Sequence, residues 1–529
     1  MRHLFLFSAI ILAGSAQAQD TYDAYNFSTS DLNGTARYVG MGGALGALGG
    51  DLTVMGTNPA ATAMYRKNDA AFTLSEVVGG NKGAFNHDRS RFSFDQAGVV
   101  VPFNMENPDT EGIQYINFGV NYRKNKNFLF NQNTNVDNLN LVYDYPDGNG
   151  YFTELSQTYQ IAGLANSCVN YNSWGSLADL SAPMYDDDGN LTQNGCIVDL
   201  YDKNGDVIYQ GVSAQDAYYQ KATYGSNVQA DINLSFNSSD RFFFGLSLGV
   251  YDISYDRESY YWEFGVDNRA YDIKSTYRTT AEGYDFKAGF IFRPIEDSPF
   301  RVGVTVHTPI WYRMTDSNYA DGMYYYDYNE ATGNFDSRSA MGQISNSEYD
   351  YNFRTPWKFG VSLGHTIGKK IAIGAEYEYT DLSTAKYSSI DGDDDYFFTQ
   401  TNSFTQDMLK GQHTVKAGLE VKPLDWLSVR CGYNYVSSGF KDTAYRSLPY
   451  DGAYTETDFT NWKGINRFTG GVGFRFKGGY FDLAYQYQSQ KGDFYAFDNY
   501  DENDPIFTLK PTSISNNRSQ FIATLGFRF

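Results

Sequence analysis

The sequence contains no run of about 20 consecutive apolar residues, the length that a membrane-spanning helix needs. Its mean hydropathy of −0.48 likewise excludes a bundle of such helices. Basic residues are also scarce, because 41 Lys and Arg stand against 62 Asp and Glu and give a net charge of −21. A nucleic-acid-binding protein needs a basic surface for the phosphates, so no nucleic acid is expected as a partner.

Cysteine is nearly absent, since the chain contains only Cys168, Cys196 and Cys431. Such a small, odd number excludes a disulfide framework. Cys168 and Cys196 would pair only if they shared an outward loop in an oxidising compartment, and the sequence leaves this open. Cys431 falls in a strand pattern and is expected to be a small apolar packing residue.

What the chain has in abundance is aromatic residues and glycine, with 46 Tyr, 39 Phe and 51 Gly. An acidic chain that was intrinsically disordered would be poor in aromatic residues, so this chain is expected to fold. A length of 529 residues indicates two or three domains or one large closed β structure. The Gly and Tyr content favours the closed β structure.

The first 18 residues have the three parts of a secretory signal. Arg2 supplies a positive start, residues 4–13 are apolar, and Ala16-Gln17-Ala18 is a small-residue cleavage site. We therefore expect residues 1–18 to be a signal peptide and the mature chain to begin at Gln19.

From about residue 70 to the C-terminus, apolar and polar residues alternate with a period of two, as in strands with one apolar face. In the last strand, Phe521, Ala523, Leu525, Phe527 and Phe529 share one face. Fourteen strands are predicted, near residues 70–78, 91–103, 113–124, 225–236, 241–255, 274–292, 299–313, 351–366, 370–387, 408–422, 427–438, 464–477, 479–490 and 517–529. At about 9–15 residues they are longer than the strands of a soluble sandwich and can cross a bilayer at a tilt.

The connections between these strands alternate in length. Those after even-numbered strands are short, and those after odd-numbered strands are longer, including 100 residues at 125–224. Outer-membrane barrels have short periplasmic turns and long outer loops. The sequence therefore predicts an all-β fold, a 14-stranded antiparallel transmembrane β-barrel over residues 70–529. We expect it in the cell outer membrane of a Gram-negative bacterium, with both ends of the barrel in the periplasm.

Aromatic residues near the strand ends are expected to form the two girdles at the membrane interfaces, and they include Trp311, Trp357, Trp426 and Trp462. The terminal Phe529 looks like the sorting signature of barrels assembled by the outer-membrane insertion machinery. We expect this machinery as a partner during assembly, outer-membrane lipid and lipopolysaccharide around the barrel, and a monomeric protein.

Residues 19–69 lack sustained alternation and are rich in Gly and Ala. The glycines of the stretch 40–51 invite a comparison with phosphate-binding loops. No βαβ unit surrounds them and no Gly-Lys-Ser/Thr follows, so that interpretation is rejected. Glycines here are expected to let the backbone turn sharply and pack closely in a confined space.

Segments throughout the mature chain resemble the FadL/TodX family of outer-membrane transporters for hydrophobic compounds, notably members from Bacteroidetes-type bacteria. The resemblance rests on residues 34–37, on Gly42, Gly43, Gly49, Gly50, Asp51, Asn58, Pro59 and Ala60, and on residues 307–312, 355–358 and 374–379. It implies that residues 19–69 form a hatch that plugs the lumen. It also implies passive uptake of a hydrophobic small molecule, with long-chain fatty acids as the expected class, and no cofactor, metal or catalytic residue.

Family membership further implies that the ligand leaves sideways into the bilayer through a kinked strand. In the second strand Asp95, Gln96 and Gly98 interrupt the apolar face, and in the third Asn117 and Gly119 would allow a bulge. Either group would mark an exit. The alternative is that these polar residues simply face the lumen.

The residues that bind the ligand are not fixed by the sequence. Arg475, Lys477 and Lys358 are expected to face the lumen and to pair with a ligand carboxylate or with acids such as Glu376 and Glu378. The 125–224 connection, which contains eleven Asp from residue 134 onward, is expected to place helical turns with an apolar face over the barrel mouth. Acidic clusters at 186–188, 202–206 and 391–395 do not match the EF-hand pattern and are interpreted as solvated loops.

Other functions stay open at this point. Histidine and tyrosine can ligate haem iron, so a haem receptor or uptake protein is one alternative. A non-transport barrel at the surface, or one associated with secretion, is another. An enzyme is not indicated, because no Ser–His motif stands out and the mature chain has only His87, His307, His365 and His413.

Overall fold

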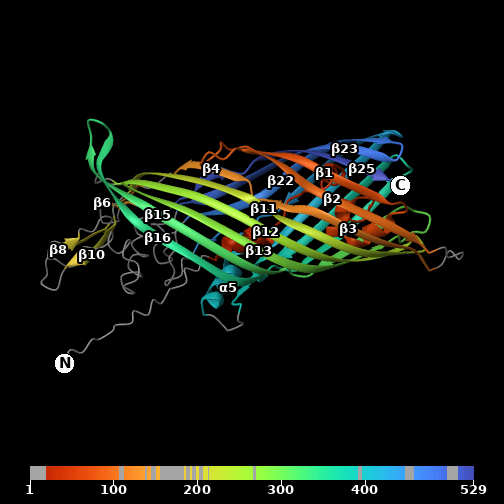
Figure 1. Cartoon of the computed structure of the whole chain (residues 1–529), viewed down its shortest axis with the longest axis horizontal. Helices are drawn as coiled ribbons and strands as arrows, with labels where there is room; N and C mark the ends of the chain where they lie inside the picture. Colours follow the sequence, from red (N-terminus) through yellow and green to blue (C-terminus); the bar gives the residue numbers. More distant parts are fainter. Residues whose placement is uncertain are drawn as a thin grey trace, which may run out of the picture.

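The chain closes into one antiparallel barrel of fourteen strands, which confirms the predicted fold class (Figure 1). The structure is a computed structural model that describes residues 19–105, 112–136, 140–144, 150–154, 184–185, 191–193, 198–201, 207–211, 214–265, 270–390, 396–446, 458–496 and 510–529. The first strand, β1 (Asp69–Gly79), pairs with the last, β25 (Arg518–Arg528). This pairing removes the free edges of the sheet, as the interior of a bilayer requires.

Nineteen strand segments build the wall, because at five positions two segments follow one another in line. After β1 they are β2 (Ser90–Asn104), β3 (Ile113–Asn127) with β4 (Phe130–Asn135), β11 (Ala214–Ser238), β12 (Phe242–Gly265), β13 (Ala270–Phe292), β14 (Arg301–His307) with β15 (Trp311–Asn329), β17 (Lys358–Ile367) with β16 (Asn334–Arg354), β18 (Ile371–Asp381) with β19 (Lys386–Ser388), β20 (Gly411–Leu424), β21 (Leu427–Val436), β22 (Phe459–Phe476), β23 (Gly479–Tyr495), and β24 (Thr512–Ser515) with β25.

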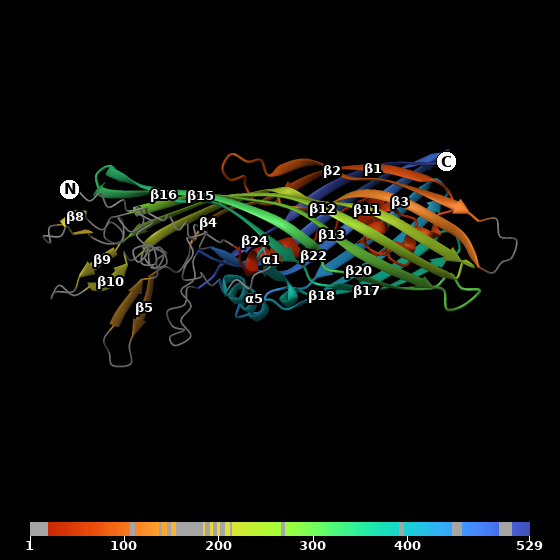
Figure 2. The same ribbon diagram turned by 60° about the horizontal axis from the view of Figure 1, so that its bottom comes forward.

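Residues 19–68 lie inside the barrel, as the red ribbon in Figure 2 shows. This hatch contains α1 (Thr21–Ser28), α2 (Ala36–Gly40), η1 (Leu52–Gly56) and η2 (Pro59–Met64). A further helix, α5 (Tyr396–Met408), and the short η3 (Leu382–Thr384) belong to the outer loops. Among the described residues, every helix is too short or too polar to cross a bilayer.

The wall has its apolar side outward and its polar side inward. Large apolar side chains such as Leu246 and Val361 are 58% and 48% exposed on the outer face, whereas Asp231 and Asn233 are fully buried on the inner face. A closed barrel with an apolar outer belt and short turns at one end is the form of an outer-membrane protein. The chain is therefore an outer-membrane barrel, and its short-turn end is the periplasmic end.

Several strands are much longer than the membrane is thick. β11, β12 and β13 have 25, 24 and 23 residues, and β15 and β16 pair over most of residues 311–354. In Figure 1 β15 and β16 extend far out at the end of the barrel opposite to the C-terminus, which is the extracellular end. The expectation that residues 256–273 and 314–350 are loops was therefore wrong for most of their length.

Trp462 and Cys431 do not lie where the sequence analysis places them. Trp462 lines the interior and packs against Phe130, because a register shift between Trp462 and Ile465 changes the face that it presents. Trp311, Trp357 and Trp426 are 36%, 48% and 51% exposed on the outer wall, as a girdle requires. Cys431 is exposed on the outer wall and is not a buried packing residue.

Some sequence expectations concern residues outside the described ranges. They include the signal peptide at 1–18, Cys168, Cys196 and the three acidic clusters. In the 125–224 connection the described parts form strands and not the expected helical turns: β5 (Asn140–Asp144), β6 (Gly150–Glu154), β7 (Met184–Tyr185), β8 (Leu191–Gln193), β9 (Val198–Tyr201) and β10 (Val207–Gly211).

Candidate functional site

The hatch owes its short helices to capping side chains. Asp20 caps α1 by accepting hydrogen bonds from the N–H groups of Tyr22 and Asp23 at 2.8 and 2.9 Å. Asp51 caps η1 and also accepts from Thr35 Oγ1 at 2.6 Å. Of the residues singled out by sequence, Asp51 thus ties two hatch segments together.

Asn58 and Pro59 begin the next hatch helix. Asn58 caps η2, and Pro59 stands at its first turn, where its missing N–H costs nothing. The Nδ2 of Asn58 donates to Gly46 O at 2.9 Å. Ala60, which is fully buried, follows directly. The Asn-Pro-Ala motif is therefore a helix start that also fixes the preceding loop.

The hatch glycines Gly42, Gly43, Gly49 and Gly50 have positive φ values of 62°, 81°, 65° and 71°. At Gly42 an added Cβ would lie 2.8 Å from the backbone N of Tyr433 in the wall. Only glycine satisfies both the conformation and the close approach there. This confirms the expectation that these glycines serve turning and close packing.

The barrel wall also has glycines where it contacts the hatch, and the sequence analysis did not single them out. Added Cβ atoms at Gly374, Gly418 and Gly432 would lie 2.0–2.3 Å from hatch backbone atoms, and those at Gly245 and Gly289 would lie 2.2 Å from atoms of residues 58–59. Hatch backbone therefore packs directly on strand backbone. The signal in the sequence that could have identified them is a glycine at a lumen-facing position in each of several strands.

Ion pairs hold the hatch to the wall where glycines do not. Arg37 Nε lies 3.0 Å from Glu420 Oε2, and the same guanidinium donates to the carbonyls of Gly49 and Gly50 at 3.1 and 2.7 Å. Asp31 Oδ1 lies 2.8 Å from Arg518 and 3.5 Å from Arg467. Burial alone would raise the pKa of Asp31, but the two guanidinium groups hold that pKa below its usual value.

The first of two lumen cavities lies between α1 and the outer part of the wall. This outer cavity has a volume of about 180 Å³. Aromatic rings form much of its lining, namely Tyr22, Tyr25, Phe128, Phe130, Tyr255, Phe440, Phe459 and Trp462. The rings continue a buried cluster that contains Phe27, Tyr277, Tyr312, Tyr351 and Tyr387. One side of the outer cavity is thus suited to an apolar ligand.

The other side of the outer cavity is charged. Six basic residues (Lys126, Lys221, Arg257, Arg446, Arg467 and Arg518) and four acids (Asp20, Asp23, Asp31 and Asp458) contribute to the lining. Burial, together with the neighbouring Asp20, raises the pKa of Asp23 to about 8, so Asp23 is mostly protonated at neutral pH. Lys126 donates to neutral oxygens of Asn26 and Thr29 at 2.8 Å. Burial also lowers the pKa of Lys126 to about 7, so this group is charged only about half of the time at neutral pH. With Asp23 protonated, the other five basic residues still outnumber the three remaining acids, so the cavity has an excess of positive charge.

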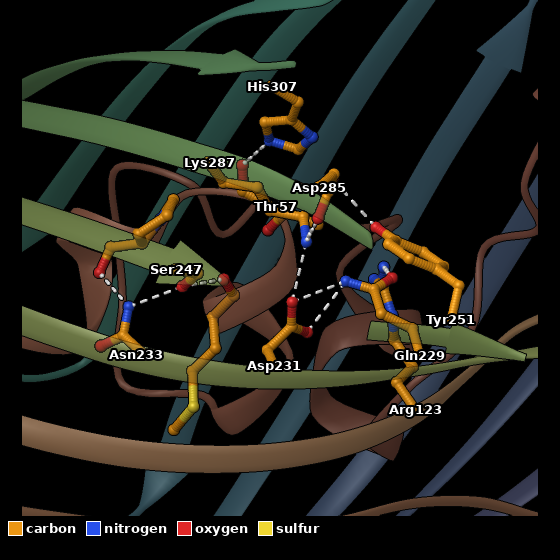
Figure 3. A network of polar contacts seen from close by, with 12 residues as sticks. Thr57, Arg123, Gln229, Asp231, Asn233, Ser247, Tyr251, Asp285, Lys287 and His307 are labelled. Atoms are coloured by element: carbon orange, nitrogen blue, oxygen red, sulfur yellow. Dashed lines mark hydrogen bonds and ion pairs between the residues drawn. The ribbon is translucent and has the colours of Figure 1, made fainter. Parts of the chain in front are cut away.

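The second cavity, of about 110 Å³, lies closer to the periplasm and is called the inner cavity. Figure 3 shows the network on one of its sides, where Lys287 Nζ lies 2.9 Å from Asp231 and 2.7 Å from Asp285. Arg123 donates to the amide oxygen of Gln229 at 2.8 Å, and its Nε has no partner among the described residues. A buried guanidinium with neutral partners can accept an anion.

A matching arrangement lies farther round the wall of the inner cavity, on β18 and β20. Lys416 Nζ lies 2.8 Å from Glu376 and 2.6 Å from Glu378. Lys358 lines the cavity and has no ion pair or hydrogen bond to any residue that the structure describes. Of the three basic residues named from the sequence, Lys358 alone lines a cavity. Arg475 and Lys477 are exposed at the periplasmic end, because β22 ends at Phe476.

The expected exit residues lie on the lumen side of β2 and β3. Asp95 is the extra residue of a bulge, since Phe94 and Gln96 pair with Leu74 and Thr73. Gln96 donates to Asn121 at 2.8 Å, and Gly98 lies against the same side chain.

Asn117 and Gly119 lie in β3, where the pairing with β2 is uninterrupted from residue 115 to 123. Asn117 donates to the hatch carbonyl of Thr62 at 2.7 Å, and Met55 of the hatch packs on Gly119. The bulges in β3 occur instead at Gln114 and Asn125, in its pairing with β11.

A seam in the wall starts at the Asp95 bulge. Pairing between β2 and β3 begins only at Gln96, so residues 90–95 have no backbone partner on the β3 side. Across this seam the rings of Phe94 and Tyr122 lie 5.6 Å apart, and Lys124 donates to Ser93 at 2.6 Å. Between the described residues of β2 and β3, side-chain contacts close the seam where backbone pairing is missing.

The described histidines have roles that the sequence did not reveal. His307 is the one histidine among the residues that line the two cavities, and its Nε2 donates to Thr57 O at 2.8 Å. His87 Nε2 lies 3.1 Å from Glu258, and His413 contacts Tyr377 at 2.8 Å. These contacts are structural and do not gather the histidines into one place.

No family model and no curated protein matches the sequence. Among solved structures, a Pseudomonas aeruginosa FadL homologue superposes with a TM-score of 0.50 at 12% identity, covering 95% of this chain and 100% of that chain. The P. putida toluene transporter TodX and the Ralstonia pickettii toluene transporter TbuX have TM-scores of 0.44 and 0.46 at 12% and 11% identity, each covering 94% of this chain and 99% of that chain. The closed barrel, the hatch inside it and the first of these superpositions show that the chain has a FadL-type fold.

Proposed function

We propose that this protein is a passive channel for hydrophobic molecules that carry an anionic head group, with long-chain fatty acids as the ligand class. The observation that supports this most directly is the outer cavity, which joins an aromatic wall to an excess of basic residues. A purely apolar ligand gains nothing from buried cations, whereas a carboxylate pairs with them.

The two cavities are too small for such a ligand in this conformation. Ligand pockets usually have volumes of about 300–1,000 Å³, whereas these have about 180 and 110 Å³. Thr29, Ser30 and Asp31 contribute to the lining of both cavities and separate them. We infer that the ligand moves this hatch segment when it passes from the outer to the inner cavity.

From the inner cavity we propose a sideways exit through the seam between β2 and β3. The Asp95 bulge and the missing backbone pairing make this the place where the wall parts without breaking sheet hydrogen bonds. An apolar ligand that leaves there enters the bilayer directly. It avoids the polar periplasmic half of the lumen.

The ligand class is tested by uptake of radiolabelled hexadecanoate and of toluene into proteoliposomes that contain the full chain. Lys126→Met removes a basic group of the outer cavity that, among the described residues, contacts neutral partners only. A carboxylate that arrives beside Lys126 favours the charged form of this group. Hexadecanoate uptake at limiting concentration should fall about fivefold while toluene uptake stays unchanged. Equal uptake of hexadecanoate by both proteins would refute the head-group assignment.

The exit is tested by cross-linking in a background in which the native cysteines are replaced by serine. A bis-maleimide between Phe94→Cys and Tyr122→Cys should block uptake, because it ties the two sides of the seam. The matched control joins Tyr433→Cys and Phe468→Cys, whose rings lie 5.2 Å apart on the outer face of β21 and β22. Unchanged uptake after cross-linking the first pair would exclude the seam.

A further inference from the structure

The outer wall is interrupted at one level in three neighbouring strand positions. The interruptions are at residues 308–310, 355–357 and 382–385, and the pairings on either side place them next to one another. Pro309 and Pro356 explain two of them, since proline cannot donate to the sheet ladder. Threonine hydroxyls replace part of it, because Phe286 N donates to Thr308 Oγ1 at 3.0 Å and Ile310 N to Thr355 Oγ1 at 2.8 Å.

A groove of about 1,080 Å³ lies on the outer wall directly beyond these interruptions. One part of its lining is apolar and includes Val250, Tyr284 and Trp311, which are 49%, 51% and 36% exposed. Another part is basic and includes Arg313, Arg354 and Lys386, of which Arg313 lies 3.5 Å from Asp350. The acids Asp252 and Glu282 lie on β12 and β13, away from β16 and β19.

The groove lies at the outer boundary of the membrane. A strand crosses the bilayer in about 9–11 residues, and Trp311 lies ten residues after Arg301, where β14 leaves the periplasmic turn. Below this level the outer face is apolar, with Val304 and Val361 exposed. The apolar part of the groove is therefore at the depth of the acyl chains, and the basic part is at the depth of the lipid head groups.

Arg354 and Lys386 continue a row of outward-facing residues across neighbouring strands. Strand pairing places Tyr284 opposite Trp311, Trp311 opposite Arg354, and Arg354 opposite Lys386, all on the outer face. Arg354 and Lys386 are exposed, and neither has an ion pair with any residue that the structure describes. Two uncompensated cations side by side are notable on a chain with a net charge of −21.

We propose that Arg354 and Lys386 bind a phosphate group of lipid A in the outer leaflet, with acyl chains of the same molecule lying in the groove. A guanidinium offers paired N–H donors to phosphate oxygens, and the neighbouring ammonium adds a point charge. Lipopolysaccharide is the anionic lipid of the extracellular leaflet, and its lipid A unit combines phosphate with several acyl chains. This site does not depend on the transported ligand, since it lies on the outside of the barrel.

The proposal is tested by native mass spectrometry of the full chain incubated with deep-rough lipopolysaccharide in detergent. The test variant is Arg354→Gln with Lys386→Gln. The matched control is Lys369→Gln with Lys370→Gln, which removes the same two charges from exposed positions at the periplasmic turn. A cation near a membrane surface is worth about a factor of five in binding, so the test variant should bind about 30-fold more weakly and the control should match the wild type.

Four results would overturn the proposal. One is equal retention of lipopolysaccharide by the test variant and the control. Another is that lipid A from which both phosphates have been removed binds as tightly as intact lipid A. The third is binding of phosphatidylglycerol as tight as that of lipopolysaccharide, with the same loss of affinity in the test variant. The fourth is displacement of the lipid by inorganic phosphate alone at millimolar concentration. Either of the last two results shows a general anion site without selection for lipid A.

Discussion

Replacing Gly432 by Ala should push the hatch away from the wall. The new Cβ would lie 2.2 Å from the backbone N of Gly42 and 2.5 Å from the carbonyl carbon of Met41, distances that real Cβ atoms do not adopt. The strand cannot retreat, because Gly432 is paired with Gly418 on one side and Thr469 on the other. The hatch has no such pairing and therefore gives way.

The size of the effect follows from the cost of overpacking, which is about 1–3 kcal/mol per site. Gly374→Ala presses on the same hatch loop from another strand, since its Cβ would lie 2.0 Å from Ala44 O. Because both act on residues 41–44, their costs are not strictly additive, and together they should weaken hatch docking by about 3 kcal/mol. A loss of about 2.8 kcal/mol raises the undocked population about 100-fold.

The assay is hydrogen exchange of residues 36–50 followed by mass spectrometry, with the heat-modifiable mobility of the barrel as a check on folding. Exchange in this segment should accelerate by about 100-fold or more in the double variant. Gly470→Ala serves as the control, because the nearest atom to its Cβ would be Arg430 O at 3.8 Å. Protection at the wild-type level in the double variant, with a folded barrel, would refute the idea that glycine contacts hold the hatch.

Three further predictions concern charged hatch residues. The pKa of Asp23 is raised from 3.8 to about 8, so the contribution of its protonated form to α1 docking is fully present below about pH 4 and is lost as pH rises to about 8. In Asp23→Asn, the protection of α1 from hydrogen exchange should no longer change with pH in this way between pH 4 and 9. Arg37→Gln leaves the carbonyls of Gly49 and Gly50 without their donor and should destabilise hatch docking by about 1–3 kcal/mol in the same assay. The control Arg66→Gln removes the partly exposed ion pair with Asp240 and should cost at most about 1 kcal/mol. Asp31→Asn should increase toluene permeation through proteoliposomes, since it removes the anion that anchors the hatch between the cavities, and permeation at the wild-type rate would contradict this.

The strands were predictable because the bilayer imposes a simple rule on each of them. Within the membrane every outward residue must be apolar and the lumen accepts polar residues, so alternation is strong and fourteen strands were found. Beyond the membrane the outward face contacts water, so outward residues need not be apolar and the alternation disappears. Asp321 and Ser317 of β15 carry no such pattern, so the sequence predicts a loop where the structure has a hairpin.

The candidate site was predictable only in part, because its residues come from distant strands. Asp51 and Asn58 carry a local signal, since each precedes a helix start that it caps. Lys126, Arg467 and Arg518 have no such signal, and nothing in their immediate sequence places them at one cavity. Their meeting depends on barrel closure and on the position of the hatch.

The position of Asp31 suggests how a ligand of the proposed class opens the hatch. Its carboxylate accepts from Arg518 at 2.8 Å and from the backbone N–H of Asn127 at 3.0 Å, with Arg467 at 3.5 Å. The same two guanidinium groups line the outer cavity, where a ligand carboxylate arrives. An incoming carboxylate offers them the same chemistry as Asp31, so exchange of one carboxylate for the other costs little electrostatic energy. The hatch segment 29–31 would then lose its anchor at the moment when the ligand gains one, which couples binding to the opening of the path between the two cavities.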